Sequence, residues 1–119
     1  MKIRFIEHHR FTEQITHLVD DEAYRKFQLC LVRNPNQGPV IPGSGGLRKA
    51  RLALPGRGKS GGARVIYWYN PDTRMIMLFH CYPKGRCENL THEQLKRLSE
   101  LAVLAKKEFQ NEKTQGNQI

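Results

Sequence analysis

The feature that most constrains this chain is a basic stretch with strand-like spacing, GSGGLRKARLALPGRGKSGGARVIYWY, at residues 43–69. Six basic residues fall within the seventeen positions 48–64, and no acid lies among them. Apolar side chains are interleaved with these cations, and two glycine-rich breaks interrupt the run. A disordered basic tail would lack so many aromatic and branched side chains. The stretch therefore predicts a hairpin whose strands hold cations on a fixed surface, and we expect a polyanion to meet that surface.

The distribution of charge along the chain supports the same interpretation. The 119 residues include 20 Lys and Arg against 11 Asp and Glu, which gives a formal net charge of +9. All eleven acids lie at or before Glu22 or at or after Asp72, so the basic residues between them have no acidic neighbours in sequence. Such a concentration of cations is typical of a nucleic-acid-binding domain. The length predicts one domain with a single core.

Cysteine usage and hydropathy restrict the class of protein further. Cys30, Cys81 and Cys87 are odd in number and have no Cys-x-x-Cys spacing, which argues against a disulfide framework and a structural zinc site. No apolar run has the length of a signal peptide or a membrane span. We therefore expect a cytoplasmic protein that uses neither a metal nor a cofactor.

Periodicity and turn residues predict the order β-α-α-β-β-β-α. Asp20 and its acidic neighbours favour a helix start, and Asn34-Pro35 ends that helix. Thr91 and Gln94 have the spacing of a capping box at the start of the last helix. Strands are predicted at residues 2–6, 47–54, 63–70 and 74–82, and helices at residues 11–18 and 20–33 and from residue 91 onward. Residues 74–82 are apolar on both faces and are predicted to be central in the sheet.

The predicted architecture is an α+β domain with an antiparallel twisted sheet and helices packed on one face. The domain is expected to span residues 1–112. Residues 113–119 are predicted to be a polar, frayed tail.

The predicted strands bring cations together. Alternation along residues 47–54 places Lys49 and Arg51 on one face and Arg48 on the other. Arg64 begins the next strand and lies on the same side as Ile66 and Trp68, so that Trp68 is a ring that could stack on a base. Further cations follow the third strand (Lys84 and Arg86) or lie on the hairpin connection (Arg57 and Lys59).

A cluster of cations with few acids suits a phosphodiester, because guanidinium groups match phosphate oxygens and lysine adds a titratable amine. RNA cleavage by the 2′-hydroxyl needs a base, stabilisation of the charged phosphorane and an acid for the leaving oxygen. Like-charged neighbours around Lys49 would help it to act as the base. The candidate proton donors are Tyr82, His80, Lys84 and Arg86. A basic binding face without catalysis remains an open alternative.

Two motif-bearing segments suggest a family. GSGGLRKARLALPGRGKSGGARVIYWY followed by FHCYPKGRCENLTHEQLKRL resembles the RelE/ParE superfamily of toxins from bacterial toxin–antitoxin modules, and it is most similar to the HigB-like branch. The resemblance covers roughly residues 20–105 and is most specific at GGLRK, at GKxGGxRVIY and at the Tyr-x-Lys before the Leu-Thr helix start. It implies a ribosome-dependent endoribonuclease that cuts messenger RNA without a metal and is neutralised by an antitoxin.

The resemblance also implies roles for individual residues. Cations important in the family correspond to Lys49, Arg51, Arg64 and Lys84, with Arg64 clamping the scissile phosphate. Gly85 stands where many members have a second basic residue, and Thr91 stands near the place where some have a catalytic tyrosine. The resemblance therefore leaves Tyr82 or Arg86 as the expected proton donor. Arg48, Arg57 and Lys59 are expected to help hold RNA.

Two other functions stay open. The ParE-like branch of the superfamily poisons DNA gyrase and lacks the basic catalytic set, so the presence of Lys49, Arg51, Arg64 and Lys84 favours the nuclease. A basic RNA-binding module without activity is the third possibility. The expected antitoxin is an acidic or helical partner that covers the basic face or the helix pair at residues 11–33.

Overall fold

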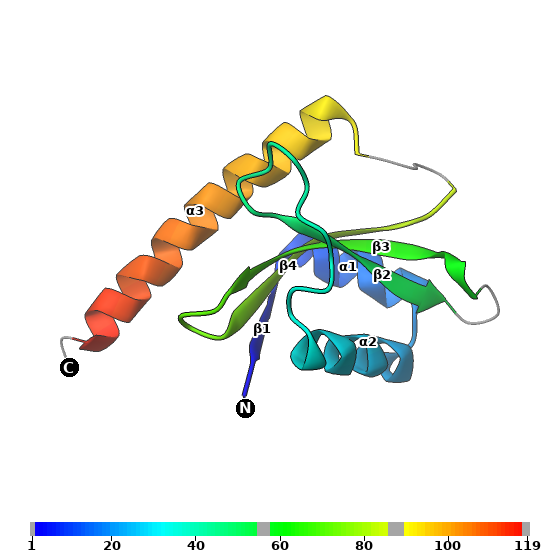
Figure 1. The fold of residues 1–119 in the computed structure, drawn as a ribbon, viewed down its shortest axis with the longest axis horizontal. Coiled ribbons are helices and arrows are strands. Elements are labelled where there is room, and N and C mark those ends of the chain that lie inside the picture. Colours follow the sequence, from blue (N-terminus) through cyan, green and yellow to red (C-terminus); the bar gives the residue numbers. More distant parts are fainter. Residues whose placement is uncertain (1, 55–57, 86–89, 118–119) are drawn as a thin grey trace.

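The computed structural model describes residues 2–54, 58–85 and 90–117 (Figure 1). Its elements are β1 (Arg4–Glu7), α1 (His9–Leu18), α2 (Asp21–Arg33), β2 (Arg48–Leu54), β3 (Gly58–Asn70), β4 (Met75–Pro83) and α3 (His92–Asn117). This order confirms the β-α-α-β-β-β-α prediction and the α+β class. No helix in the described part of the chain is both long enough and apolar enough to span a membrane.

Local sequence signals explain where the helices begin. The Asp20 carboxylate accepts a hydrogen bond of 2.8 Å from the Ala23 N–H and so caps α2. The capping box of α3 forms as predicted, because the Gln94 N–H donates to Thr91 Oγ1 at 3.1 Å and the Thr91 N–H donates to Gln94 Oε1 at 2.9 Å. His8 caps α1 by accepting from the Arg10 N–H. These caps satisfy backbone donors that a helix start would otherwise leave unpaired.

The sheet has the strand order β1-β4-β3-β2. The apolar strand β4 lies inside the sheet, as predicted. The prediction of an antiparallel sheet was wrong for one pair, because β1 runs parallel to β4, with Phe5 beside Ile76. The chain between these two strands includes α1, α2, β2 and β3. A tight turn between two neighbouring strands forces them to run antiparallel, but the long connection between β1 and β4 allows them to run parallel.

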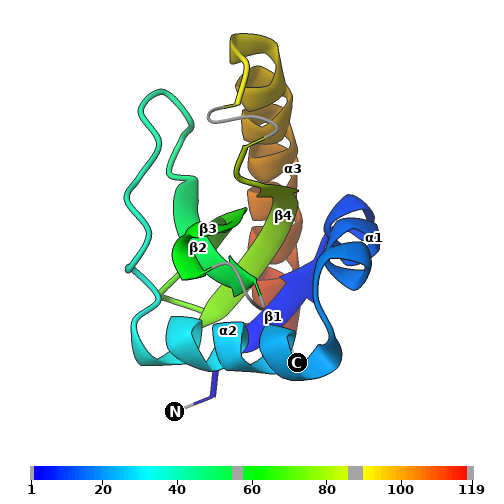
Figure 2. The ribbon, with the colours of Figure 1, turned by 90° about the vertical axis from the view of Figure 1, so that its right-hand side faces the viewer.

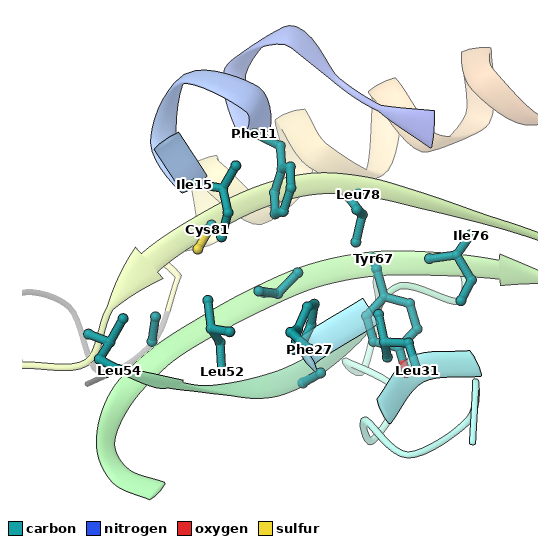
Figure 3. Packing of buried hydrophobic residues seen from close by; sticks show 13 residues of the cluster. Phe11, Ile15, Phe27, Leu31, Leu52, Leu54, Tyr67, Ile76, Leu78 and Cys81 are labelled. Carbon is teal, nitrogen blue, oxygen red and sulfur yellow. The ribbon is translucent and has the colours of Figure 1, made fainter. Parts of the chain in front are cut away.

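Helices cover both faces of the sheet. Phe11, Ile15, Phe27 and Leu31 of α1 and α2 pack with Val65, Tyr67 and Leu78 in one buried cluster (Figure 3). Leu98, Ala102 and Ala105 of α3 pack with Ile66, Phe79 and Tyr82 in a second cluster. The prediction that all helices lie on one face was therefore wrong. Because β3 and β4 carry apolar side chains on both faces, the second face also needs a cover, and α3 supplies it.

Helix α3 also runs further than predicted. It extends to Asn117, beyond the domain boundary expected at residue 112 (Figure 1). Once a helix has formed its first turns, each added residue gains a backbone hydrogen bond without a further nucleation cost, so polar residues can continue it.

Candidate nucleic-acid interface

The ladder between β2 and β3 places three cations on one face of the sheet. Lys49 lies opposite Ile66, and Arg51 lies opposite Arg64. Residues directly opposite each other in a ladder share a face. The structure therefore brings Lys49, Arg51 and Arg64 together, as the alternation predicted. Helix α3 covers the same face at Ile66 and Trp68, so the open part of this face is the end that carries the three cations.

These cations line one side of a cleft of about 500 Å³. Its residues are Gln37, Gly38, Pro39, Lys49, Ala50, Arg51 and Arg64, and none of them is acidic. The Arg64 residue is only 9% exposed and its Nη1 donates to the Ala63 carbonyl at 3.2 Å. Lys49 is half-buried and Arg51 is exposed. A partly buried cation cluster beside an open arginine is suited to an anion that enters from solvent.

The opposite wall of the cleft is made by residues 37–39, and Tyr67 holds the segment 35–39 from the other face of the sheet. The Tyr67 hydroxyl donates to the Pro35 carbonyl at 2.7 Å and accepts from the Gly38 N–H at 3.1 Å. The Lys49 N–H donates to the Pro39 carbonyl at 3.1 Å. A Cβ at Gly38 would lie 2.7 Å from the Lys49 carbonyl oxygen, so only glycine allows this approach. The loop that contains this wall stands beside β2 in Figure 2.

Arg48 takes part in this wall rather than in the cation cluster. It lies opposite Tyr67, on the face away from Lys49. Its Nη1 donates to the carbonyls of Gly38 at 2.8 Å and Asn36 at 3.1 Å. Arg48 therefore lies on the face away from Lys49 and Arg51, as the alternation predicted, and apart from the cations with which it was expected to help hold RNA. Sequence reasoning missed Gln37, Gly38 and Pro39, because a loop rich in glycine and proline has no period that locates it against β2.

Strand β4 adds polar side chains beside Arg64. Tyr82 lies opposite Arg64 in the ladder and is buried. The ring of His80 lies 5.6 Å from that of Tyr82, and His80 Nδ1 is 3.0 Å from Gln14 Nε2. Burial lowers the pKa of His80, and the positive charge of Arg10 lowers it further. His80 is therefore neutral at neutral pH, which weakens its case as the proton donor.

The structure describes only some of the remaining predicted site residues. Lys84 is exposed just past β4, and its N–H donates to the Gly62 carbonyl at 2.9 Å, which holds its backbone next to β3. Arg57 and Arg86 lie outside the described residues, and Lys59 is described only through its backbone in β3.

The Trp68 ring is in contact with other residues of this chain. It lies on the Arg64 side of β3, as predicted, but it packs against the α3 cluster, and Lys106 Nζ lies 5.0 Å from its ring centroid. This position suits a core residue better than a stacking platform. Within the described part of the chain, no group of three or more His, Cys, Asp or Glu side chains is placed to hold a metal ion.

The fold and the cleft define a small α+β domain with an acid-free cationic site on its sheet. A family model described as the RelE toxin of the RelE/RelB toxin–antitoxin system matches residues 14–117. The chain belongs to this family. Its structure is similar to a chain in the crystal structure of the archaeal RelE–RelB complex from Pyrococcus horikoshii OT3. The TM-score is 0.50 and the sequence identity 24%, over 73% of this chain and 100% of that chain. At that identity the likeness shows a shared fold.

Proposed function

We propose that this protein is the toxin of a type II toxin–antitoxin system and acts as an mRNA interferase, an endoribonuclease that cuts messenger RNA on the ribosome. The observation that carries the proposal is the grouping of Lys49, Arg51 and Arg64 in a cleft without acids. Membership of the RelE toxin family supports it. Translation in the cytoplasm would be the process that the toxin stops.

The proposed reaction is an internal displacement at phosphorus. The 2′-hydroxyl loses its proton to a base and its oxygen bonds to the adjacent phosphorus, while the bond to the 5′-oxygen breaks and an acid protonates that oxygen. Arg64 and Arg51 are assigned to the phosphate oxygens, where charge develops in the transition state. Lys49, beside them in the cleft, is assigned to the 2′-hydroxyl. Among the described residues the candidate proton donors are Tyr82, opposite Arg64, and Lys84, which is exposed just past β4.

We propose dependence on the ribosome from the resemblance to the RelE toxins, and the lining of the cleft supports it. Its cations can bind a phosphate, but nothing else among its lining residues would align the attacking hydroxyl with the leaving oxygen. Orientation of this kind contributes roughly 7–11 kcal/mol to a barrier. We assign that contribution to the ribosome, which would hold the messenger RNA in place. The archaeal relative was crystallised with RelB, and on that basis we propose a protein antitoxin as the natural partner.

Primer extension on a reporter messenger RNA in a translating extract tests the proposal. Wild type, Arg64→Ala and the exposed helix variant Arg25→Ala are compared, with a parallel sample without ribosomes. The expected result is discrete cuts within codons for wild type and Arg25→Ala, with none for Arg64→Ala and none without ribosomes. If expression of the protein arrests the growth of cells but no cuts appear in the extract, the nuclease proposal is contradicted and gyrase becomes the candidate target. Binding of RNA without cuts or arrest would leave a binding module.

Binding measurements separate catalysis from simple attraction. Each phosphate contact adds a share of a salt-dependent affinity, so a binding surface loses only part of its affinity when one cation is removed. A catalytic arginine is needed for every turnover, and its loss is expected to abolish cleavage while RNA affinity falls only modestly. Equal losses of affinity and cleavage in Arg64→Ala would contradict the catalytic role.

A further inference from the structure

A second cavity, of about 700 Å³, lies between helix α2 and strand β2. Its floor is apolar and includes Phe27, Leu52 and Leu54. Its residues include Gln37 and Arg51, which also line the cationic cleft. The two cavities therefore adjoin at Arg51. We call the second one the edge groove, since it follows the outer edge of β2.

Strand β2 is the last strand of the sheet, and the described residues pair with its outer edge only at residues 47–49. The Lys49 N–H points outward to the Pro39 carbonyl, whereas a Cβ on Gly62 of β3 would clash with the Leu52 carbonyl oxygen, which therefore faces inward. Backbone groups of a strand alternate between its two sides. Arg51 accordingly directs its N–H and C=O groups away from β3. The register of the β2–β3 ladder shifts between Leu52 and Leu54, and Ala53 between them pairs with no residue of β3; both Arg51 and Ala53 are exposed.

The chain itself already pairs with the first half of this edge. Val40 forms a bridge with Arg48, and Pro39 accepts the Lys49 N–H, so residues 39–40 act as a short added strand. Gly38 still lies against Ala50, but among the described residues no backbone hydrogen bond joins this loop to β2 beyond Lys49. An open edge beside an apolar groove is a template for an extended peptide, because the backbone provides hydrogen bonds and the groove takes alternate side chains.

The charges of the edge groove indicate what such a peptide carries. The Asp20 carboxylate caps α2, and Glu22 forms an ion pair with Lys26 at 3.7 Å. Arg51 forms no ion pair with any described residue. Asp20 is thus engaged by the helix start and Glu22 by Lys26, whereas no hydrogen bond or ion pair among the described residues engages the Arg51 guanidinium, which lies on the face of β2 opposite Leu52. A strand added here would turn one side chain toward Leu52 and the next toward Arg51.

We propose that the antitoxin neutralises this toxin by adding an extended segment of alternating apolar and acidic residues to the β2 edge at Arg51–Ala53. This inference rests on the proposed function only for the existence of the antitoxin. The apolar side chains fill the edge groove over Phe27 and Leu52, and a carboxylate pairs with Arg51. Arg51 is thereby withdrawn from the cleft, and RNA affinity falls although the cleft itself stays empty.

The first test uses a synthetic, terminally blocked peptide that alternates aspartate and valine. Binding is followed by backbone amide chemical shifts of the ¹⁵N-labelled protein. The expected result is saturable binding with the largest shifts at Arg51 and Ala53. Two control peptides have the same side chains, and each is N-methylated at every second amide, so that each has the N–H groups of one edge blocked. Only one edge of the peptide would pair with β2. The control with that edge blocked is therefore expected to bind at least tenfold more weakly.

Protein variants locate the site independently. Ala53→Pro removes the N–H of a residue that has no partner in the β2–β3 ladder, and proline is tolerated at sheet edges and bulges. It is expected to weaken peptide binding, whereas Ala53→Val is not. Cys30→Tyr is also expected to weaken peptide binding, because Cys30 lines the edge groove and the larger side chain would fill it. The matched control is Leu29→Tyr, at an exposed position on α2 that does not line the groove.

The outcomes are separable from those of the nuclease test. Shifts centred on Lys49 and Arg64 that persist with both methylated peptides would overturn the proposal, because they would reveal simple attraction of an acidic peptide to the cleft. An absence of shifts at millimolar peptide would overturn it as well. If the edge shifts appear but the wild-type protein cuts no messenger RNA, the proposed function fails and the docking site stands.

Discussion

Arg51 and Arg64 lie directly opposite each other in the antiparallel ladder of β2 and β3. Like charges at such positions destabilise a sheet, because the side chains project from the same face at close range. No acid lines the cleft beside them. The pair therefore costs folding free energy, and an anion bound between the two guanidinium groups would offset that cost. This arrangement is what a stability–function trade-off predicts for a binding site.

The trade-off can be measured with Arg51→Gln. Removing one charge is expected to raise the free energy of unfolding by about 0.2–1 kcal/mol, the range for a cross-strand pair. The same variant is expected to lose messenger RNA cleavage. Urea unfolding at low salt measures the first effect, and primer extension measures the second. Arg25→Gln, on the exposed surface of α2, serves as the control and should change neither. A less stable Arg51→Gln protein would contradict the repulsion.

Tyr67 carries a second prediction, because its hydroxyl is buried and holds the cleft wall by two hydrogen bonds. Tyr67→Phe leaves the Gly38 N–H and the Pro35 carbonyl without this partner, which is expected to cost about 1–3 kcal/mol of unfolding free energy. Hydrogen exchange at the Gly38 amide should accelerate in parallel. Tyr69→Phe, on the next residue of the same face, is the control. Unchanged exchange at Gly38 would show that other contacts hold the wall.

The sequence predicted well what depends on local pattern. Alternation along β2 and β3 placed Lys49, Arg51 and Arg64 on one face, because side chains in a strand repeat every two residues whatever the rest of the fold does. The capping box at Thr91 is equally local, since both of its hydrogen bonds join residues three positions apart. The family resemblance rested on the same motif-bearing segments and was confirmed at the level of the RelE family.

Features that depend on distant contacts were missed. The direction of β1 is set by its place beside β4, and the face that α3 covers is set by which side of β3 remained uncovered. The cleft wall depends on a contact between Gly38 and Tyr67, residues 29 positions apart. Arg48 was predicted to help hold RNA because of its charge, and its hydrogen bonds to the carbonyls of Gly38 and Asn36 in the loop were not foreseen. Hydrophobic periodicity does not report on such pairings.

Cysteine reactivity provides a third prediction. Burial raises the pKa of Cys81 to about 12, so its thiolate is scarce at mildly alkaline pH. Cys30 is exposed on α2. Iodoacetamide is expected to label Cys30 in the native protein and Cys81 only after denaturation, with peptide mapping by mass spectrometry as the measurement. Equal rates of labelling at the two sites in native protein would show that the sheet opens readily around Cys81.

The last prediction concerns acid stability, which two histidines are expected to control. Burial lowers the pKa values of His8 and His80, and nearby positive charge lowers them further, from His9 and Arg10 at His8 and from Arg10 at His80. The unfolded chain, with histidine near 6.5, then binds more protons than the folded chain. The free energy of unfolding therefore falls as pH drops below about 6.5, by at most about 1.4 kcal/mol per pH unit for each histidine.

Substitution separates the two contributions. His8→Asn keeps a side chain that can cap α1 but does not titrate, so it should flatten the acid limb of a plot of unfolding free energy against pH. His80→Gln should flatten it as well, and the double variant should do so most. His17→Gln, at an exposed position in α1, is the control. If the double variant loses stability in acid as steeply as wild type, the protons responsible bind elsewhere, and the burial of these two rings does not govern the acid limit.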